Sequence, residues 1–114
     1  YKQKAQLVSG AEIYKGCAIA TSSWEHGDYR VAAAQAADEL LNVSGIEASF
    51  VLAKIGHNIV ISGRSLDSIN VQLLLEKVGG GGHITIAGAQ LSNWGLGIAE
   101  MQLKAAIDSV LYDD

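Results

Sequence analysis

The feature that most constrains this chain is a run of four glycines followed by a histidine, Gly79 to His83. Glycine loses more backbone entropy on folding than any other residue, so four in a row need a structural reason. Without Cβ atoms, successive N–H groups can turn inward as an anion-binding concavity, and a histidine directly after it can add a hydrogen bond or a charge. The alternative is a flexible linker or a long helix cap, for which one glycine would be sufficient. The run therefore favours a phosphate-binding loop.

Length and composition place this run in a folded domain. The chain has 114 residues, of which 49% are hydrophobic and none is proline, as is typical of one globular domain. Its apolar runs are shorter than the roughly 18 residues of a membrane-spanning helix, and residues 1–4 do not begin a signal peptide. We therefore expect no membrane contact by this chain. Because the chain does not begin with methionine, we expect it to be a piece of a longer protein or a processed product.

The charge and the cysteine content of the chain indicate which ligands and which cellular compartment to expect. The net charge is −4, with only two arginines, Arg30 and Arg64. A general nucleic-acid binder usually shows a basic patch, so we expect this chain to hold a few phosphates with a few groups. The single Cys17 cannot form an internal disulfide, which indicates a cytoplasmic protein. Its apolar surroundings predict a core residue rather than a nucleophile.

Hydrophobic periodicity predicts an α/β (α+β) domain, with a mixed sheet and helices packed on it. The expected strands cover residues 12–21, 46–55, 59–62 and 88–91; the expected helices cover residues 29–42, 70–78 and 96–111, with a helical turn at 83–87. Residues 46–55 are apolar on both alternating faces, which is typical of a central strand covered on both sides. A hairpin turn is expected at residues 56–58.

Several local signals can be tested individually. Asp28 is expected to cap the first predicted helix, and Asn70 or Ser68 the second. Trp94 is expected to be a packing residue. The loop from Trp24 to Asp28 is expected to be solvated, with an alternative in which Trp24 stacks on a bound base.

Taken together, the motifs resemble the DHHA1 domain, the C-terminal half of DHH-family phosphoesterases. The resemblance is carried by residues 36–41, 45–51, 62–65, 69–72, 79–83 and 87–91, and it covers roughly residues 10–112. The spacing and the Asn-Val-Gln element at residues 70–72 are most similar to the GdpP-type enzymes, which hydrolyse cyclic di-AMP.

The resemblance implies a division of the chain and a set of substrate contacts. Residues 1–10 would be the remnant of an interdomain linker, and residues 11–114 the substrate-binding DHHA1 domain. The implied substrate-binding residues are Arg64, Ser65, Asn70, Gly80, Gly81, Gly82 and His83, none of them catalytic. Simpler alternatives stay open: a surface salt bridge for Arg64, helix capping for Asn70 and a structural hydrogen bond for His83.

The resemblance also implies that catalysis belongs to an upstream DHH domain, whose Asp and His ligands hold a pair of divalent metals, usually manganese. This chain has no Asp-His-His segment, so we expect it to bind no metal and to show little or no hydrolysis alone. The parent protein would be a manganese-dependent phosphodiesterase, cytoplasmic and anchored in the bacterial cell membrane.

Other functions remain open. The chain could instead be the DHHA1 half of an oligoribonuclease or 3′-phosphoadenosine phosphatase, which shares the motif but differs in substrate length. A non-catalytic RNA-binding or dimerisation module, as in the related C-terminal domain of alanyl-tRNA synthetase, would bind RNA with a steep salt dependence. The acidic balance argues against that module. The expected partners are a cyclic dinucleotide or short oligonucleotide and the upstream DHH domain, with a homodimer left open.

Overall fold

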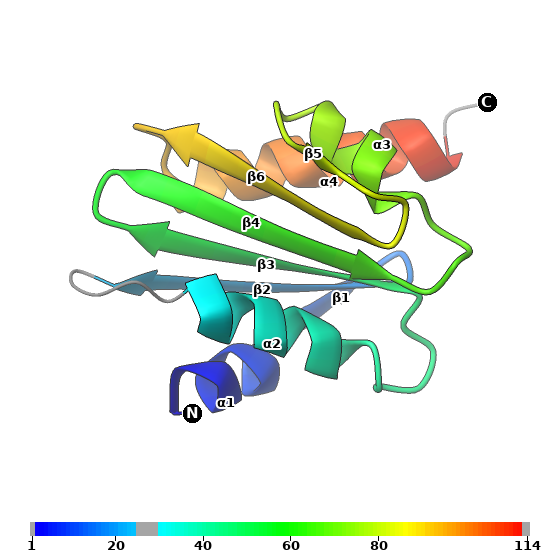
Figure 1. The fold of residues 1–114 in the computed structure, drawn as a ribbon, viewed down its shortest axis with the longest axis horizontal. Coiled ribbons are helices and arrows are strands. Elements are labelled where there is room, and N and C mark those ends of the chain that lie inside the picture. Colours follow the sequence, from blue (N-terminus) through cyan, green and yellow to red (C-terminus); the bar gives the residue numbers. More distant parts are fainter. Residues whose placement is uncertain (1, 25–29, 113–114) are drawn as a thin grey trace.

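A six-stranded mixed sheet with helices on both faces is the framework of the computed structural model, which describes residues 2–24 and 30–112 (Figure 1). In chain order the elements are α1 (Lys2–Ser9), β1 (Glu12–Tyr14), β2 (Cys17–Trp24), α2 (Arg30–Leu40), β3 (Ala48–Ile55), β4 (Asn58–Ser65), α3 (Val71–Glu76), β5 (Gly81–Gly82), β6 (Ile86–Ser92) and α4 (Leu96–Tyr112). The strand order is β1-β2-β3-β4-β6-β5. Only β2 and β3 pair in parallel among these strands, which confirms the predicted mixed sheet.

The single strand predicted over residues 12–21 is wrong, because the chain reverses within it. Lys15 and Gly16 both have positive φ, at 50° and 81°. This turn folds β1 back antiparallel on β2, with Tyr14 opposite Cys17. A turn that needs two left-handed residues is costly for lysine, and only the glycine beside it signals the reversal.

The predicted central strand is confirmed in β3. It is buried on both faces, with Phe50 and Leu52 in one hydrophobic cluster and Val51 and Ala53 in the other. The expected hairpin turn joins it to β4, with Gly56 at a positive φ of 62°. β4 continues to Ser65, beyond the predicted residues 59–62, so Arg64 lies within the strand and not after it.

Each face of the sheet carries its own core. α3 and α4 cover one face, while α1 and α2 cover the other over β2 and β3 (Figure 1). Leu7 of α1 is 2% exposed, so residues 2–9 are an integral part of this packing. Whether residues 1–10 also connect to another domain stays a prediction.

The helical turn predicted at residues 83–87 is wrong, because this segment makes a tight hairpin. β5 pairs antiparallel with β6, with Gly81 opposite Gly88 and Gly82 opposite Ala87. The glycines permit this approach, since a Cβ on Gly82 would lie 2.6 Å from the Ala87 Cα, and one on Gly80 would overlap the Gly88 carbonyl oxygen. β6 therefore begins at Ile86, before the predicted residues 88–91.

The remaining local predictions are mostly confirmed. The Asn70 side chain caps α3 by accepting a hydrogen bond from the Leu73 amide at 3.0 Å, and α4 matches the predicted 96–111. Trp94 packs against the core under α3 and α4. Cys17 is fully buried, and burial followed by the charge of Glu47 raises its pKa to about 11.

Two local predictions fall on residues that the structure does not describe. The Asp28 cap and the loop at residues 25–29 lie outside the described residues. Among the helices of residues 2–24 and 30–112, none is long and apolar enough to cross a bilayer.

Candidate functional site

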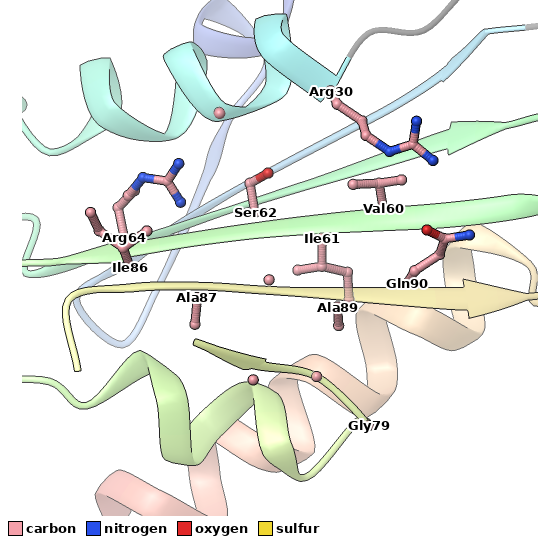
Figure 2. Close-up of a pocket in the computed structure, with 14 residues that line it drawn as sticks. Arg30, Val60, Ile61, Ser62, Arg64, Gly79, Ile86, Ala87, Ala89 and Gln90 are labelled. Carbon is pink, nitrogen blue, oxygen red and sulfur yellow. The ribbon is translucent and has the colours of Figure 1, made fainter. Parts of the chain in front are cut away.

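One half of one sheet face is left uncovered. α1 and α2 lie over β2 and β3, and beside α2 the strands β4, β6 and β5 form an open groove of about 700 Å³ (Figure 2). The floor of the groove is made by β4 and β6. α2 forms one side, with Arg30 and Ala34, and the glycine run forms the other, with Gly79 to Gly81.

Strand alternation decides which side chains form the floor, because successive residues point to opposite faces. On β4, Val60, Ser62 and Arg64 face the groove, whereas Ile61 is turned to the core (Figure 2). Pairing between β4 and β6 then places three rows across the floor: Arg64 with Ile86, Ser62 with Gly88, and Val60 with Gln90. Gly81 extends the middle row through its pairing with Gly88.

The middle row is flat and contains an unused hydroxyl. A Cβ on Gly81 would meet no atom within 4 Å, so open space lies above it. Ser62 is 9% exposed, and within the described residues its hydroxyl has no hydrogen-bond partner. The other two buried serines are satisfied, since Ser49 donates to the Ala37 carbonyl and Ser65 to the Ile69 carbonyl at 2.6 Å. The Ser62 hydroxyl is therefore available to a ligand.

Arg64 is held in place at one end of the groove. Its Nε donates to Asp38 Oδ1 on α2 at 3.0 Å, and its Nη1 donates to the Gly63 carbonyl at 2.9 Å. The salt bridge considered as an alternative is thus present, although Asp38 is 65% exposed and such a pair contributes little stability. In the described chain Nη2 has no partner, so the guanidinium keeps N–H groups for a ligand.

The glycine run is built differently from the expected concavity of free N–H groups. The Gly79 amide donates to the Glu76 carbonyl at 3.1 Å and the Gly80 amide to the Leu75 carbonyl at 2.7 Å. These two amides are therefore used within the chain. The run instead supplies a flat rim without side chains, in which Gly80 and Gly81 line the groove.

The predicted site residues are only partly brought together. Arg64, Gly80 and Gly81 line the groove, whereas Gly82 does not. Ser65 lies on the opposite face of β4, where its hydroxyl is turned to core carbonyls, and Asn70 caps α3. Ser65 therefore hydrogen-bonds within the core and Asn70 caps a helix, and neither residue lines the groove.

His83 lies just beyond the Arg64 end of the groove. Its amide donates to the Ile86 carbonyl at 2.7 Å, and Ile86 is paired with Arg64. His83 is therefore two strand spacings of about 4.8 Å, or about 10 Å, from Arg64 along one row of the sheet. The residue is exposed and accessible to a ligand that reaches past Ile86.

Ser62, Gln90 and Arg30 were not predicted as site residues. Alternation along β4 would have placed Ser62 beside Arg64 once the strand was extended to residue 65. Gln90 lies within the strand predicted at residues 88–91, but its place in the groove depends on the pairing of β6 with β4. The only sequence signal for Arg30 was that it is one of two arginines. Figure 2 shows Arg30 and Gln90 on opposite sides of the Val60 end of the groove.

The groove is suited to binding an anion rather than to acid–base chemistry. Arg30 and Arg64 are the only ionisable side chains among its described lining residues. Nor do residues 2–24 and 30–112 contain a group of three His, Cys, Asp or Glu side chains that could hold a metal ion.

Comparisons with known proteins agree with this fold and motif. The model of the DHHA1 domain matches residues 16–112. The chain is 48% identical over 109 residues to the cyclic-di-AMP phosphodiesterase GdpP of Geobacillus thermodenitrificans, covering 94% of this chain and 17% of that protein. It is 45% identical over 111 residues to the cyclic-di-AMP phosphodiesterase PdeA of Listeria monocytogenes, covering 96% of this chain and 17% of that protein. The chain thus spans about a sixth of the length of these relatives.

Solved structures support the fold at low sequence identity. An exopolyphosphatase-related protein from Bacteroides fragilis superposes with a TM-score of 0.76 at 19% identity, over 95% of this chain and 34% of the other. The C-Ala domain of Aquifex aeolicus alanyl-tRNA synthetase superposes with a TM-score of 0.66 at 18% identity, over 84% of this chain and 96% of the other. Since the sequence match extends over most of the chain and the sheet is shared, this chain belongs to the DHHA1 domain family.

Proposed function

We propose that this chain is the substrate-binding domain of a phosphodiesterase that hydrolyses cyclic di-AMP to pApA. The observation that carries the proposal is the guanidinium of Arg64, which is oriented by Asp38 and Gly63 and keeps Nη2 for a ligand. A guanidinium can bind two oxygens of one phosphate in a fixed geometry. Cyclic di-AMP as substrate is suggested by the names of relatives that are 45–48% identical.

Arg64 would bind a phosphate, and the glycine floor would let the ligand approach the backbone closely. Ser62, Gly88 and Gly81 leave the middle of the groove free of bulk. His83, beyond Ile86, would contact the same or a second phosphate from the far side. The implied contacts of Gly80, Gly81 and Gly82 would then come mainly from their lack of side chains.

The hydrolytic step would take place outside this chain. We assign the manganese pair to an upstream DHH domain of the parent protein, which makes this domain a binding half with little activity of its own. A cytoplasmic location is consistent with the single buried Cys17. A homodimer stays an untested prediction.

The test is an amide NMR titration of the chain with cyclic di-AMP, linear pApA and a short RNA at two salt concentrations. We expect either dinucleotide to shift the amides of Ser62, Arg64 and Gly81. Arg64→Ala should weaken binding about tenfold or more, because a charge-assisted hydrogen bond contributes about 1.5–3 kcal/mol. Lys77→Ala, an exposed residue after α3, removes the same charge as a matched control and should have little effect.

Two results would contradict the proposal. Tighter binding of RNA than of either dinucleotide, with a steep loss at the higher salt, would indicate an RNA-binding module. Dinucleotide binding that Arg64→Ala leaves unchanged would show that the phosphate is held elsewhere.

A further inference from the structure

The end of the groove opposite Arg64 presents a side-chain amide without a partner. Gln90 is exposed on β6 and is paired with Val60 of β4. Within the described residues, its amide forms no hydrogen bond. Figure 2 shows this side chain on the groove side of β6, at the end where Arg30 lies.

The spacing of the rows matches the order of groups in a nucleotide. Arg64 and Val60 are four residues apart on one strand, or about 13 Å at 3.3–3.4 Å per residue. The flat Ser62–Gly88–Gly81 row lies between the two ends. With a phosphate bound at Arg64, a ribose would lie over the flat row and a base would reach Gln90.

Ser62 gives the middle of the groove a specific polar contact. Ser62 is 9% exposed, and its hydroxyl faces the groove and has no partner in the described chain. A serine hydroxyl can both donate and accept a hydrogen bond, so it can pair with a ribose hydroxyl in either direction. The other two buried serines, Ser49 and Ser65, each donate a hydrogen bond to a backbone carbonyl.

The amide of Gln90 suits one purine better than the other. A side-chain amide places an acceptor beside a donor, and this pair matches the N6 amino group and N7 of adenine. Guanine presents two acceptors, O6 and N7, at the same edge, and one of them would face the amide oxygen. Val60, opposite Gln90, adds an apolar contact for the ring.

We propose that Gln90 recognises the base of the nucleotide whose phosphate is bound by Arg64, and that it selects adenine over guanine. This inference rests on the proposed function, because it assumes a phosphate at Arg64. Gln90 is then the specificity-determining residue of the groove, and Ser62 is a ribose contact.

The test compares three ligands that share a phosphate: AMP, GMP and ribose 5-phosphate, titrated against the chain by NMR. We expect AMP to bind about tenfold more tightly than ribose 5-phosphate, and GMP to show little or none of this gain. Gln90→Met keeps the side-chain length but removes both hydrogen bonds. It should reduce AMP binding to the level of ribose 5-phosphate while leaving ribose 5-phosphate unchanged.

The matched control is Gln102→Met on α4, on the opposite side of the sheet, which should change none of the three affinities. A second variant, Gln90→Arg, should reverse the preference towards GMP, because arginine pairs with O6 and N7 of guanine. Unchanged AMP selectivity in both Gln90 variants would overturn the inference and leave phosphate binding intact. If none of the three ligands binds at Arg64, the proposed function fails and the inference fails with it.

Discussion

The two faces of the sheet differ in how completely they are covered. α3 and α4 close one face over β3, β4 and β6, with residues such as Phe50, Ile59 and Leu103 fully buried. On the other face, α1 and α2 cover β2 and β3 and leave β4, β6 and β5 open. One face therefore supplies most of the apolar burial, and the other leaves part of the sheet open as the groove.

The same strands serve both purposes by alternation. In β4, Ile59, Ile61 and Ser65 face the closed side, whereas Ser62 and Arg64 face the groove. Two serines three residues apart thus have opposite environments. Substitutions paired across the two faces should separate stability from ligand binding.

The largest expected contrast is between two isoleucines on opposite faces. Ile59→Ala should lower the free energy of unfolding by about 2–5 kcal/mol, because it leaves a cavity in the closed core. Ile86→Ala should cost less than about 1 kcal/mol, since this side chain is 52% exposed in the groove. Urea unfolding followed by circular dichroism measures both, and equal losses would contradict the assignment of the two faces.

Two neighbouring glycines should behave in opposite ways. Gly80→Ala should destabilise the chain by about 1–3 kcal/mol, because the new Cβ overlaps β6. Gly81→Ala should keep the stability within about 1 kcal/mol, since its Cβ meets nothing within 4 Å. Its methyl group should nevertheless weaken binding of cyclic di-AMP, because it projects into the groove.

Urea unfolding and the NMR titration separate these two effects. If Gly81→Ala binds cyclic di-AMP as well as the unmodified chain does, the ligand does not lie on the flat row.

The two serines of β4 give a smaller contrast. Ser65→Ala should cost about 1–3 kcal/mol of stability, because it leaves the buried carbonyl of Ile69 without its donor. Ser62→Ala should leave the stability nearly unchanged and weaken dinucleotide binding several-fold. The reverse pattern would indicate that Ser65 contacts the substrate, as the sequence resemblance implies.

The smallest effect concerns the attachment of α4 to the β1–β2 turn. Hydrogen bonds from Lys15 at 2.7 Å and from Tyr14 at 2.9 Å lower the pKa of Asp108 below its ordinary value of 3.8. A carboxyl whose pKa is lower in the folded state adds stability above its unfolded pKa. This contribution is lost as the pH falls through the folded value.

Asp108→Asn should therefore lower the urea midpoint slightly at pH 7, and the difference from the unmodified chain should disappear at a pH below the lowered pKa of the folded state. Asp67→Asn, on the exposed loop after β4, is the control with no comparable change expected. A constant difference at both pH values would show that the carboxylate charge of Asp108 is not responsible.

Much of the fold could be predicted where one segment carries its own signal. Apolar residues on both faces identified β3, the Asn70 cap identified the start of α3, and the apolar stripe identified α4. The glycine–histidine motif and the Arg64 element also indicated the family that the comparisons then showed. Each of these signals is local, so it does not depend on which elements become neighbours.

The tertiary structure decided what the local signals left open. Residues 83–87 belong to the hairpin of β5 and β6 and not to a helical turn, because β6 offers an edge that only glycines can approach so closely. Which serine of β4 faces the groove also depends on which face α3 and α4 cover. Sequence alternation alone gives two sets of residues without saying which set is buried.

The sequence by itself therefore predicted β3, α3 and α4, indicated the family, and singled out Arg64 and the glycine run as candidate site residues. Only the tertiary structure placed Ser62 beside Arg64 and Gln90 at the opposite end of the same groove, and turned Ser65 into the core. The physical reason is that hydrophobic burial fixes the orientation of a strand only when its covering helices are in place, and the groove is the part of the sheet that they leave open.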